Sequence, residues 1–201
     1  TMACSVQTTP TNESLDSTDS AVFLWGTESA IQYIADASAL SEKQRRSIQT
    51  VNEVLGVKLV KLRVALPMFT REGNGWSSKV LGCPPPPQPR ACTVIGDMDE
   101  TAKVFQENGW SMLPMLTHDP SRSPITPADI EEYVDFVDWF VGRYGASTSI
   151  RYVELVNAPQ ELWLGTPEQL VELTNRTYER LKAKYPDVLV GTPGFEYPAV
   201  D

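Results

Sequence analysis

The sequence predicts an α/β fold in which parallel strands alternate with helices. Short apolar runs that end in turn residues are each followed by a segment with helical spacing, and this order repeats four times before a last apolar run. Strands that alternate with helices pair in parallel through crossover connections. A chain of 201 residues, 41% hydrophobic and 21% charged, is long enough to bury the core of one such domain.

Five runs are expected to form the strands, because each is rich in strand-forming residues and stops at glycine, proline or polar residues. They are Val22–Gly26, Val57–Leu66, Trp110–Leu116, the run from Ile150 that stops at Asn157-Ala158-Pro159, and Val188–Gly191. The segment between Pro67 and Gly96 is expected to be a long loop, because it contains a glycine-rich stretch and four consecutive prolines.

Four helices are predicted from side chains that can cap their first turn, and Gly56 supplies a left-handed end to the first of them. The capping signals are Ser41 with Gln44, Asp97 with Glu100, Thr126 with Asp129, and Thr166 before a helix that runs from Pro167 to Lys184. Apolar residues recur at helical spacing behind each signal, so each helix is expected to cover one face of the sheet.

Residues 1–20 are expected to form a flexible tail, because they are rich in Ser, Thr, Asp and Asn and carry almost no apolar residues. Residues 21–201 are expected to form the folded domain. Both an open doubly wound sheet and part of a (β/α)8 barrel fit its order of elements. A complete barrel takes about 250 residues, whereas no glycine-rich phosphate loop follows the first predicted strand, as a doubly wound sheet usually has. The prediction is a partial TIM-barrel-type domain with about five of its strands, the C-terminal part missing.

Composition excludes several classes of partner. The formal net charge of -9 argues against nucleic acid, which requires clustered Lys and Arg. No run approaches the roughly 18 apolar residues of a membrane span.

Cys83 and Cys92 bracket the four prolines without metal-ligand spacing, so a disulfide is expected, and with it a secreted or cell-surface location. One histidine, His118, argues against a metal site, and no cofactor is expected.

Polar and aromatic residues follow the predicted strands, where (β/α) folds bind their ligands. The candidates for substrate binding are Asn157, Arg63, His118, Trp163 and Glu196. Each has a structural alternative. These are an ion pair of Arg63 with a core carboxylate such as Glu154, a strand-ending turn at Asn157, solvated loop positions for His118 and Glu196, and loop anchoring by Trp163.

One stretch resembles a known family. Tyr152-Val-Glu-Leu-Val-Asn157-Ala158-Pro159, followed by Trp163 and by Gly165-Thr-Pro-Glu-Gln-Leu-Val-Glu-Leu173, resembles the fourth βα unit of retaining (β/α)8-barrel glycoside hydrolases. The similarity is greatest to the xylosidase- and iduronidase-like family and its cellulase-like relatives, and it covers roughly residues 22–198. It implies that Asn157 binds the sugar 2-hydroxyl and that Arg63 supports the site.

Ala158 stands where that family has its acid/base glutamate, so the proton-donating carboxylate is absent. Loss of general acid–base catalysis costs on the order of 10²–10⁴-fold in rate. The family's nucleophile follows the seventh strand, beyond the five predicted here. The resemblance therefore implies a glycoside hydrolase-like module that acts on or binds carbohydrate and is inactive as written. The alternative is a non-catalytic carbohydrate-binding or structural cell-surface module, completed by self-association or by a missing C-terminal half.

Overall fold

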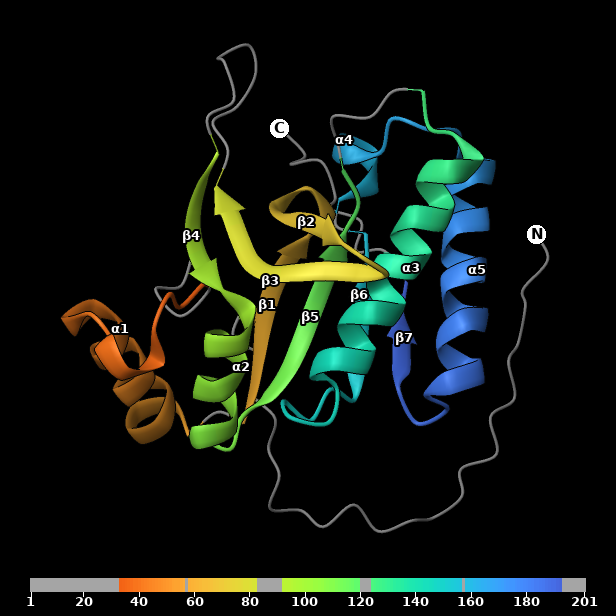
Figure 1. Cartoon of the computed structure of the whole chain (residues 1–201). Coiled ribbons are helices and arrows are strands. Elements are labelled where there is room, and N and C mark those ends of the chain that lie inside the picture. Colours follow the sequence, from red (N-terminus) through yellow and green to blue (C-terminus); the bar gives the residue numbers. More distant parts are fainter. Residues whose placement is uncertain (1–32, 57, 83–91, 120–123, 157, 193–201) are drawn as a thin grey trace, which may run out of the picture.

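The computed structural model describes residues 33–56, 58–82, 92–119, 124–156 and 158–192. Four parallel strands form one sheet at its centre, in the order β1-β5-β6-β7 (Figure 1). Their bounds are β1 Leu59–Ala65, β5 Ser111–Thr117, β6 Tyr152–Leu155 and β7 Leu189–Gly191. The predicted α/β class is confirmed. The predicted tail over residues 1–20 and the predicted strand Val22–Gly26 lie outside the described residues.

The strands of this sheet follow one another in space in the same order as along the chain. The β1–β5 ladder is the longest and extends to Ala65 opposite Thr117, while β6 pairs with β5 through Leu155 opposite Leu116. A doubly wound sheet reverses its strand order at a switch point. No reversal occurs among the described strands, so this sheet is consistent with part of an α/β barrel.

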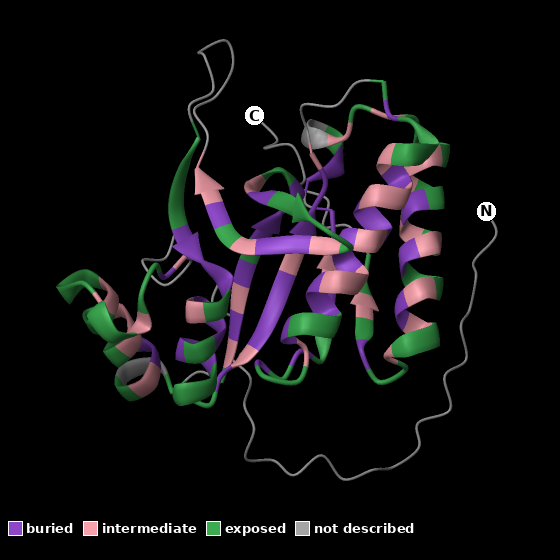
Figure 2. Cartoon of the chain, in the orientation of Figure 1, coloured by how far each residue is buried: buried purple, intermediate pink, exposed green. Residues whose placement is uncertain are grey.

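Three long helices cover one face of the sheet (Figure 1). Side chains of the strands alternate accordingly, since Leu62 and Val64 of β1 are buried on the helix side whereas Arg63 is exposed on the other. Figure 2 shows the buried residues concentrated where the strands face the helices. The helices are α2 Met98–Glu107, α3 Pro127–Tyr144 and α5 Pro167–Lys184.

The capping signals position most of the helices as predicted. The box of Ser41 and Gln44 opens α1, and the left-handed Gly56, with φ of 61°, ends the π-helical segment η2 that continues it. Boxes also form at the starts of α3 and α5. The elements before β1 are η1 Ala37–Ala39, α1 Glu42–Gln49 and η2 Thr50–Leu55.

The capping box predicted for Asp97 with Glu100 is wrong, although α2 begins where expected. Asp97 Oδ1 accepts a hydrogen bond from the Asp99 backbone N–H at 2.9 Å. Glu100 Oε2 instead accepts one from the Ala37 backbone N–H at 2.8 Å. The Glu100 carboxylate therefore links α2 to η1 through the Ala37 N–H instead of capping the start of its own helix.

The long loop predicted between Pro67 and Gly96 is also wrong for its described part. A three-stranded antiparallel sheet stands there, in the order β2-β3-β4. Gly73 and Asn74 form a two-residue turn, and Gly73 adopts a φ of 57° that suits glycine. The elements are η3 Leu66–Met68, β2 Phe69–Glu72, β3 Gly75–Gly82 and β4 Thr93–Asp97.

Aromatic packing explains why this hairpin forms. The rings of Phe69 and Trp76 each lie 5.3 Å from the ring of Phe136 on α3, and Trp139 lies 5.6 Å from Trp76. All but Trp139 are buried, and aromatic pairs at such distances contribute about 0.5–1.5 kcal/mol beyond their area burial. The hairpin of β2 and β3 is thus held by the burial of Phe69 and Trp76 against α3, a helix that begins far along the chain.

The sheet face opposite the helices is partly open. Tyr152 of β6 and Leu189 of β7 are register partners on this face, and they are 44% and 52% exposed. Lys61 Nζ lies 2.7 Å from Glu154 Oε2, so this ion pair joins β1 to β6 across β5. In the part of the chain that the structure describes, this face holds charge and half-exposed apolar side chains rather than a closed core.

Candidate functional site

The carboxyl ends of β1, β5 and β6 meet at one edge of the sheet. Ala65 and Thr117 are register partners there, and the Val156 backbone N–H donates to the Leu116 carbonyl at 2.8 Å. Parallel α/β sheets bind ligands at this edge, because the loops that follow the strands can supply side chains without disturbing the sheet. This carboxyl edge is therefore the candidate site.

The structure brings His118 and Trp163 together at the carboxyl edge. Their ring centroids lie 4.9 Å apart at an interplanar angle of 68°, an edge-to-face contact. His118 is only 5% exposed, and Trp163 is half-buried. Trp163 Nε1 donates to the Thr166 carbonyl at 2.9 Å, and an added Cβ at Gly165 would come within 2.8 Å of its ring. The N-cap of α5 and a close glycine thus hold the indole against the histidine.

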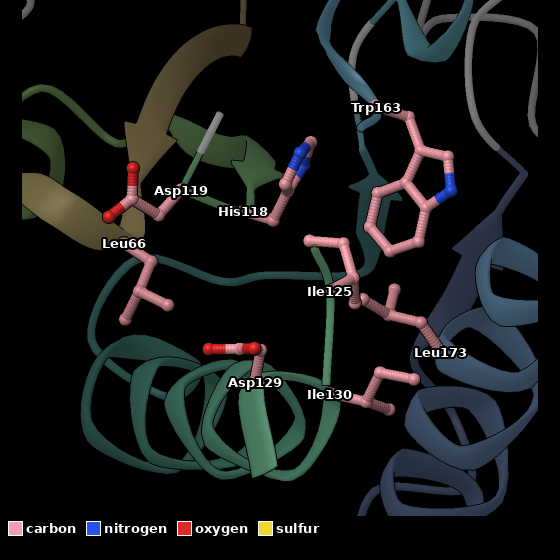
Figure 3. Close-up of a pocket in the computed structure, with 8 residues that line it drawn as sticks. All are labelled: Leu66, His118, Asp119, Ile125, Asp129, Ile130, Trp163 and Leu173. Atoms are coloured by element: carbon pink, nitrogen blue, oxygen red, sulfur yellow. The ribbon is translucent and has the colours of Figure 1, made fainter. Parts of the chain in front are cut away.

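A small cavity lies beside this pair, and Figure 3 shows the side chains around it. Its volume is about 10 Å³, room for about one water molecule and far too little for a sugar ring. The Asp129 carboxylate at its edge accepts from the Thr126 backbone N–H at 2.8 Å, so it serves the capping box of α3. The lining residues are Leu66, His118, Asp119, Ile125, Asp129, Ile130, Trp163 and Leu173. The cavity therefore has no room for a ligand between the two rings.

Arg63 lies exposed on the open face of β1, opposite Met115 of β5. Its backbone carbonyl accepts a hydrogen bond from Tyr33 Oη at 2.6 Å, which fixes the strand at this point. The ion pair considered for Arg63 with Glu154 does not form, because Lys61 occupies that carboxylate. The Arg63 guanidinium is therefore available on the sheet face that adjoins the carboxyl edge.

Ala158 is buried, with 2% exposure, and has left-handed backbone angles of φ 43° and ψ 58°. Val156 is also left-handed, with φ of 53°. Left-handed angles cost non-glycine residues roughly 1–2 kcal/mol each. They are rare both for a β-branched residue such as Val156 and for a residue before a proline, such as Ala158 before Pro159. Pro159 begins the short helix α4, Pro159–Leu162. Strain is thus concentrated where β6 ends.

Several predicted site residues lie outside the described residues. Among them are Asn157, Glu196 and Cys83. Their proposed roles, and the Cys83–Cys92 disulfide, stay predictions. The ligand-binding roles of Arg63, His118 and Trp163 likewise stay predictions.

Two features of the carboxyl edge and the adjoining sheet face were not predicted from the sequence. Thr117 Oγ1 is buried at the end of β5 without a hydrogen-bond partner among the described residues. The Lys61–Glu154 pair spans the middle of the sheet. The alternation Lys61-Leu62-Arg63-Val64 does signal a strand with one polar face, but nothing in the sequence indicates which carboxylate either cation meets.

No group of three or more His, Cys, Asp or Glu residues suited to a metal ion occurs in the described ranges. None of the helices that the structure describes is both long enough and apolar enough to cross a membrane.

Comparison with known proteins gives weak likeness in structure and none in sequence. No family model and no curated protein matches the sequence. The chain is similar in structure to wild-type ZgEngAGH5_4, a glycoside hydrolase family 5 enzyme, with a TM-score of 0.39 and 12% sequence identity. The alignment covers 77% of this chain and 51% of the other, so the chain spans about half the length of that structure. A likeness at this level is loose, and no residue role is transferred from it.

Proposed function

We propose that the protein is a carbohydrate-binding module with a glycoside hydrolase-like architecture and that it does not turn over glycosides as written. The observations that support the proposal are the His118–Trp163 pair at the carboxyl edge and the exposed Arg63 on the adjoining open face of β1. A half-buried indole offers an apolar surface to a sugar ring, and a guanidinium donates hydrogen bonds to its hydroxyl oxygens.

The proposed lack of turnover rests on Ala158. A methyl group transfers no proton, and the position is buried, so a glutamate placed there would be held away from water and would favour its protonated form. In a chain that also carries the family's nucleophile, Ala158→Glu is expected to raise hydrolysis of unactivated glycosides by about 10²-fold or more. Equal rates for the alanine and glutamate forms would contradict the proposal that position 158 is a disabled acid/base.

Binding can be measured separately from turnover. Isothermal titration with neutral hexasaccharides built from glucose, xylose or mannose is expected to detect binding that Arg63→Met weakens by about tenfold. Lys58→Met is the matched control, because Lys58 is an exposed cation just before the amino end of β1. Two results would refute a sugar site at the carboxyl edge. One is that Arg63→Met binds every sugar as tightly as the unsubstituted chain, and the other is that Arg63→Met and Lys58→Met weaken binding equally.

The open face of the sheet favours a second candidate, a structural cell-surface module that self-associates. Tyr152 and Leu189 are half exposed on that face, and burying apolar surface of this kind drives association. In this second proposal another copy of the chain covers the face. Secretion, with the Cys83–Cys92 disulfide, belongs to both candidates.

A further inference from the structure

A wide groove lies along the outer side of α3, apart from the carboxyl edge. Its walls are the β2–β3 turn, α3 and the end of α5, and Figure 1 shows that turn reaching across to α3. The groove has a volume of about 650 Å³, within the roughly 300–1,000 Å³ of ligand pockets. It is therefore large enough for a saccharide, unlike the cavity beside His118.

Trp139 and Tyr185 line this groove, and each packs closely against a glycine that has no side chain to displace it. An added Cβ at Gly75 would come within 2.8 Å of the Trp139 indole, and one at Gly142 would come within 2.6 Å of Tyr185 Oη. Trp139 is also braced by Trp76 at 5.6 Å and is only half-buried. These contacts support the half-buried indole from behind, so a sugar ring that stacks on it orders little of the protein.

The polar groups of the groove offer both donors and acceptors. Arg71 Nη2 lies 3.8 Å from Asp135 Oδ2, Lys184 pairs with Asp138, and Tyr185 Oη lies 3.4 Å from Asp138 Oδ1. A third cation of the groove, Arg143, has its Nη2 2.7 Å from Asp99 Oδ2. Each cation of the groove is thus paired with a carboxylate. An anion would meet two carboxylates here, whereas the hydroxyls of a neutral sugar both donate and accept hydrogen bonds.

We infer that this groove is a second saccharide-binding surface, selective for neutral oligosaccharides, with Trp139 as its stacking platform. The inference goes beyond the site proposed at the carboxyl edge and does not depend on Arg63, His118 or Trp163.

The indole N–H resonance of Trp139 tests this inference. In ¹⁵N-labelled protein the resonance is assigned with Trp139→Phe and followed during titration with the same neutral hexasaccharides. We expect a saturable shift at millimolar sugar. Gly142→Gln fills the groove at an exposed helical position and raises helix propensity. Its Cβ has to displace only the hydroxyl end of the Tyr185 side chain, so the variant should fold and weaken binding about tenfold or more. Ala128→Gln, at an exposed position of α3 outside the groove, is the matched control and should bind normally.

The outcomes separate the two sites. Arg63→Met should leave the Trp139 shift unchanged, even if no sugar binds at the carboxyl edge. The inference is overturned if no hexasaccharide moves the Trp139 resonance, or if Gly142→Gln binds as tightly as Ala128→Gln. A shift produced by oligouronates but not by neutral sugars would overturn the neutral selectivity.

Discussion

At the scale of the residue, the left-handed Ala158 is the most informative position. Its φ of 43° places the Cβ too close to its own backbone, a strain that glycine does not have. Ala102, also buried but within α2, has ordinary helical geometry, so glycine there only loses helix propensity. The same substitution should therefore have opposite effects at the two positions.

We expect Ala158→Gly to stabilise the fold by about 0.5–1 kcal/mol and Ala102→Gly to destabilise it by about 1 kcal/mol. The free energy of unfolding, measured in urea for both variants, checks the pair. A similar loss in both would mean that residue 158 is not left-handed in solution.

Tyr133 is a second residue with a distinct signature. Burial raises the pKa of its phenol well above the ordinary value, and its Oη donates to the Leu116 carbonyl at 2.8 Å. Below about pH 10 the folded and unfolded chains both keep the phenolic proton, so the stabilisation is complete. As pH rises above that value the unfolded chain loses the proton first, and stability falls.

Tyr133→Phe should therefore cost about 1 kcal/mol at pH 7 through the lost hydrogen bond. The same substitution should flatten the decline of stability above pH 10, measured by urea unfolding across that range. Tyr178→Phe is the control, because Tyr178 is 49% exposed and should alter neither quantity. An unchanged alkaline slope in Tyr133→Phe would contradict the role of the buried phenol.

At the scale of the element, the β2–β3 hairpin depends on close contact with α3. Gly75 leaves no room for a Cβ against Trp139, whose ring is braced by Phe69 and Trp76. Gly75→Ala is expected to destabilise the fold by about 1–3 kcal/mol, the usual range for overpacking. Asn74→Ala, at the exposed neighbouring turn position, should cost less than about 0.5 kcal/mol. Chemical denaturation compares the two, and equal costs would show that the hairpin does not rest on Trp139.

The hairpin also illustrates what the sequence could not reveal. The strands of the parallel sheet were predictable, because β5 is an apolar run and β1 alternates apolar with charged residues, each bounded by turn residues. By contrast, β2 is four residues with only Phe69 buried, and its partner helix lies more than 50 residues further along the chain. Local pattern carries no information about such a distant partner, so this segment was predicted to be a loop.

At the scale of the whole molecule, the sheet has one covered face and one open face. If a second copy covers the open face, the chain should sediment as an oligomer. Leu189→Glu should then yield monomers, because it places a charge in the contact. Val171→Glu, at an exposed position of α5 on the helix side, is the control. Sedimentation velocity that finds monomers for the unsubstituted chain would rule out self-association.

The carboxyl edge as a site follows from the order of strands and helices, so the sequence predicted its place in the fold. The partners within it were less accessible. His118 and Trp163 lie 45 positions apart, and their contact depends on how β5, α4 and the N-cap of α5 meet in space. The pairing of Glu154 with Lys61 rather than Arg63 was likewise not predictable, because both cations lie on one face of β1 and Arg63 is the one level with Glu154, both opposite Met115.

The Lys61–Glu154 pair also has an evolutionary consequence. The two residues are 93 positions apart, yet the loss of either alone leaves a partly buried charge without its counterion. Replacing both by apolar residues costs far less than removing one. Among related sequences, positions 61 and 154 should therefore change together, as charge swaps or as paired apolar residues. Such covariation would record the β1-β5-β6 order in sequences alone, without any structure.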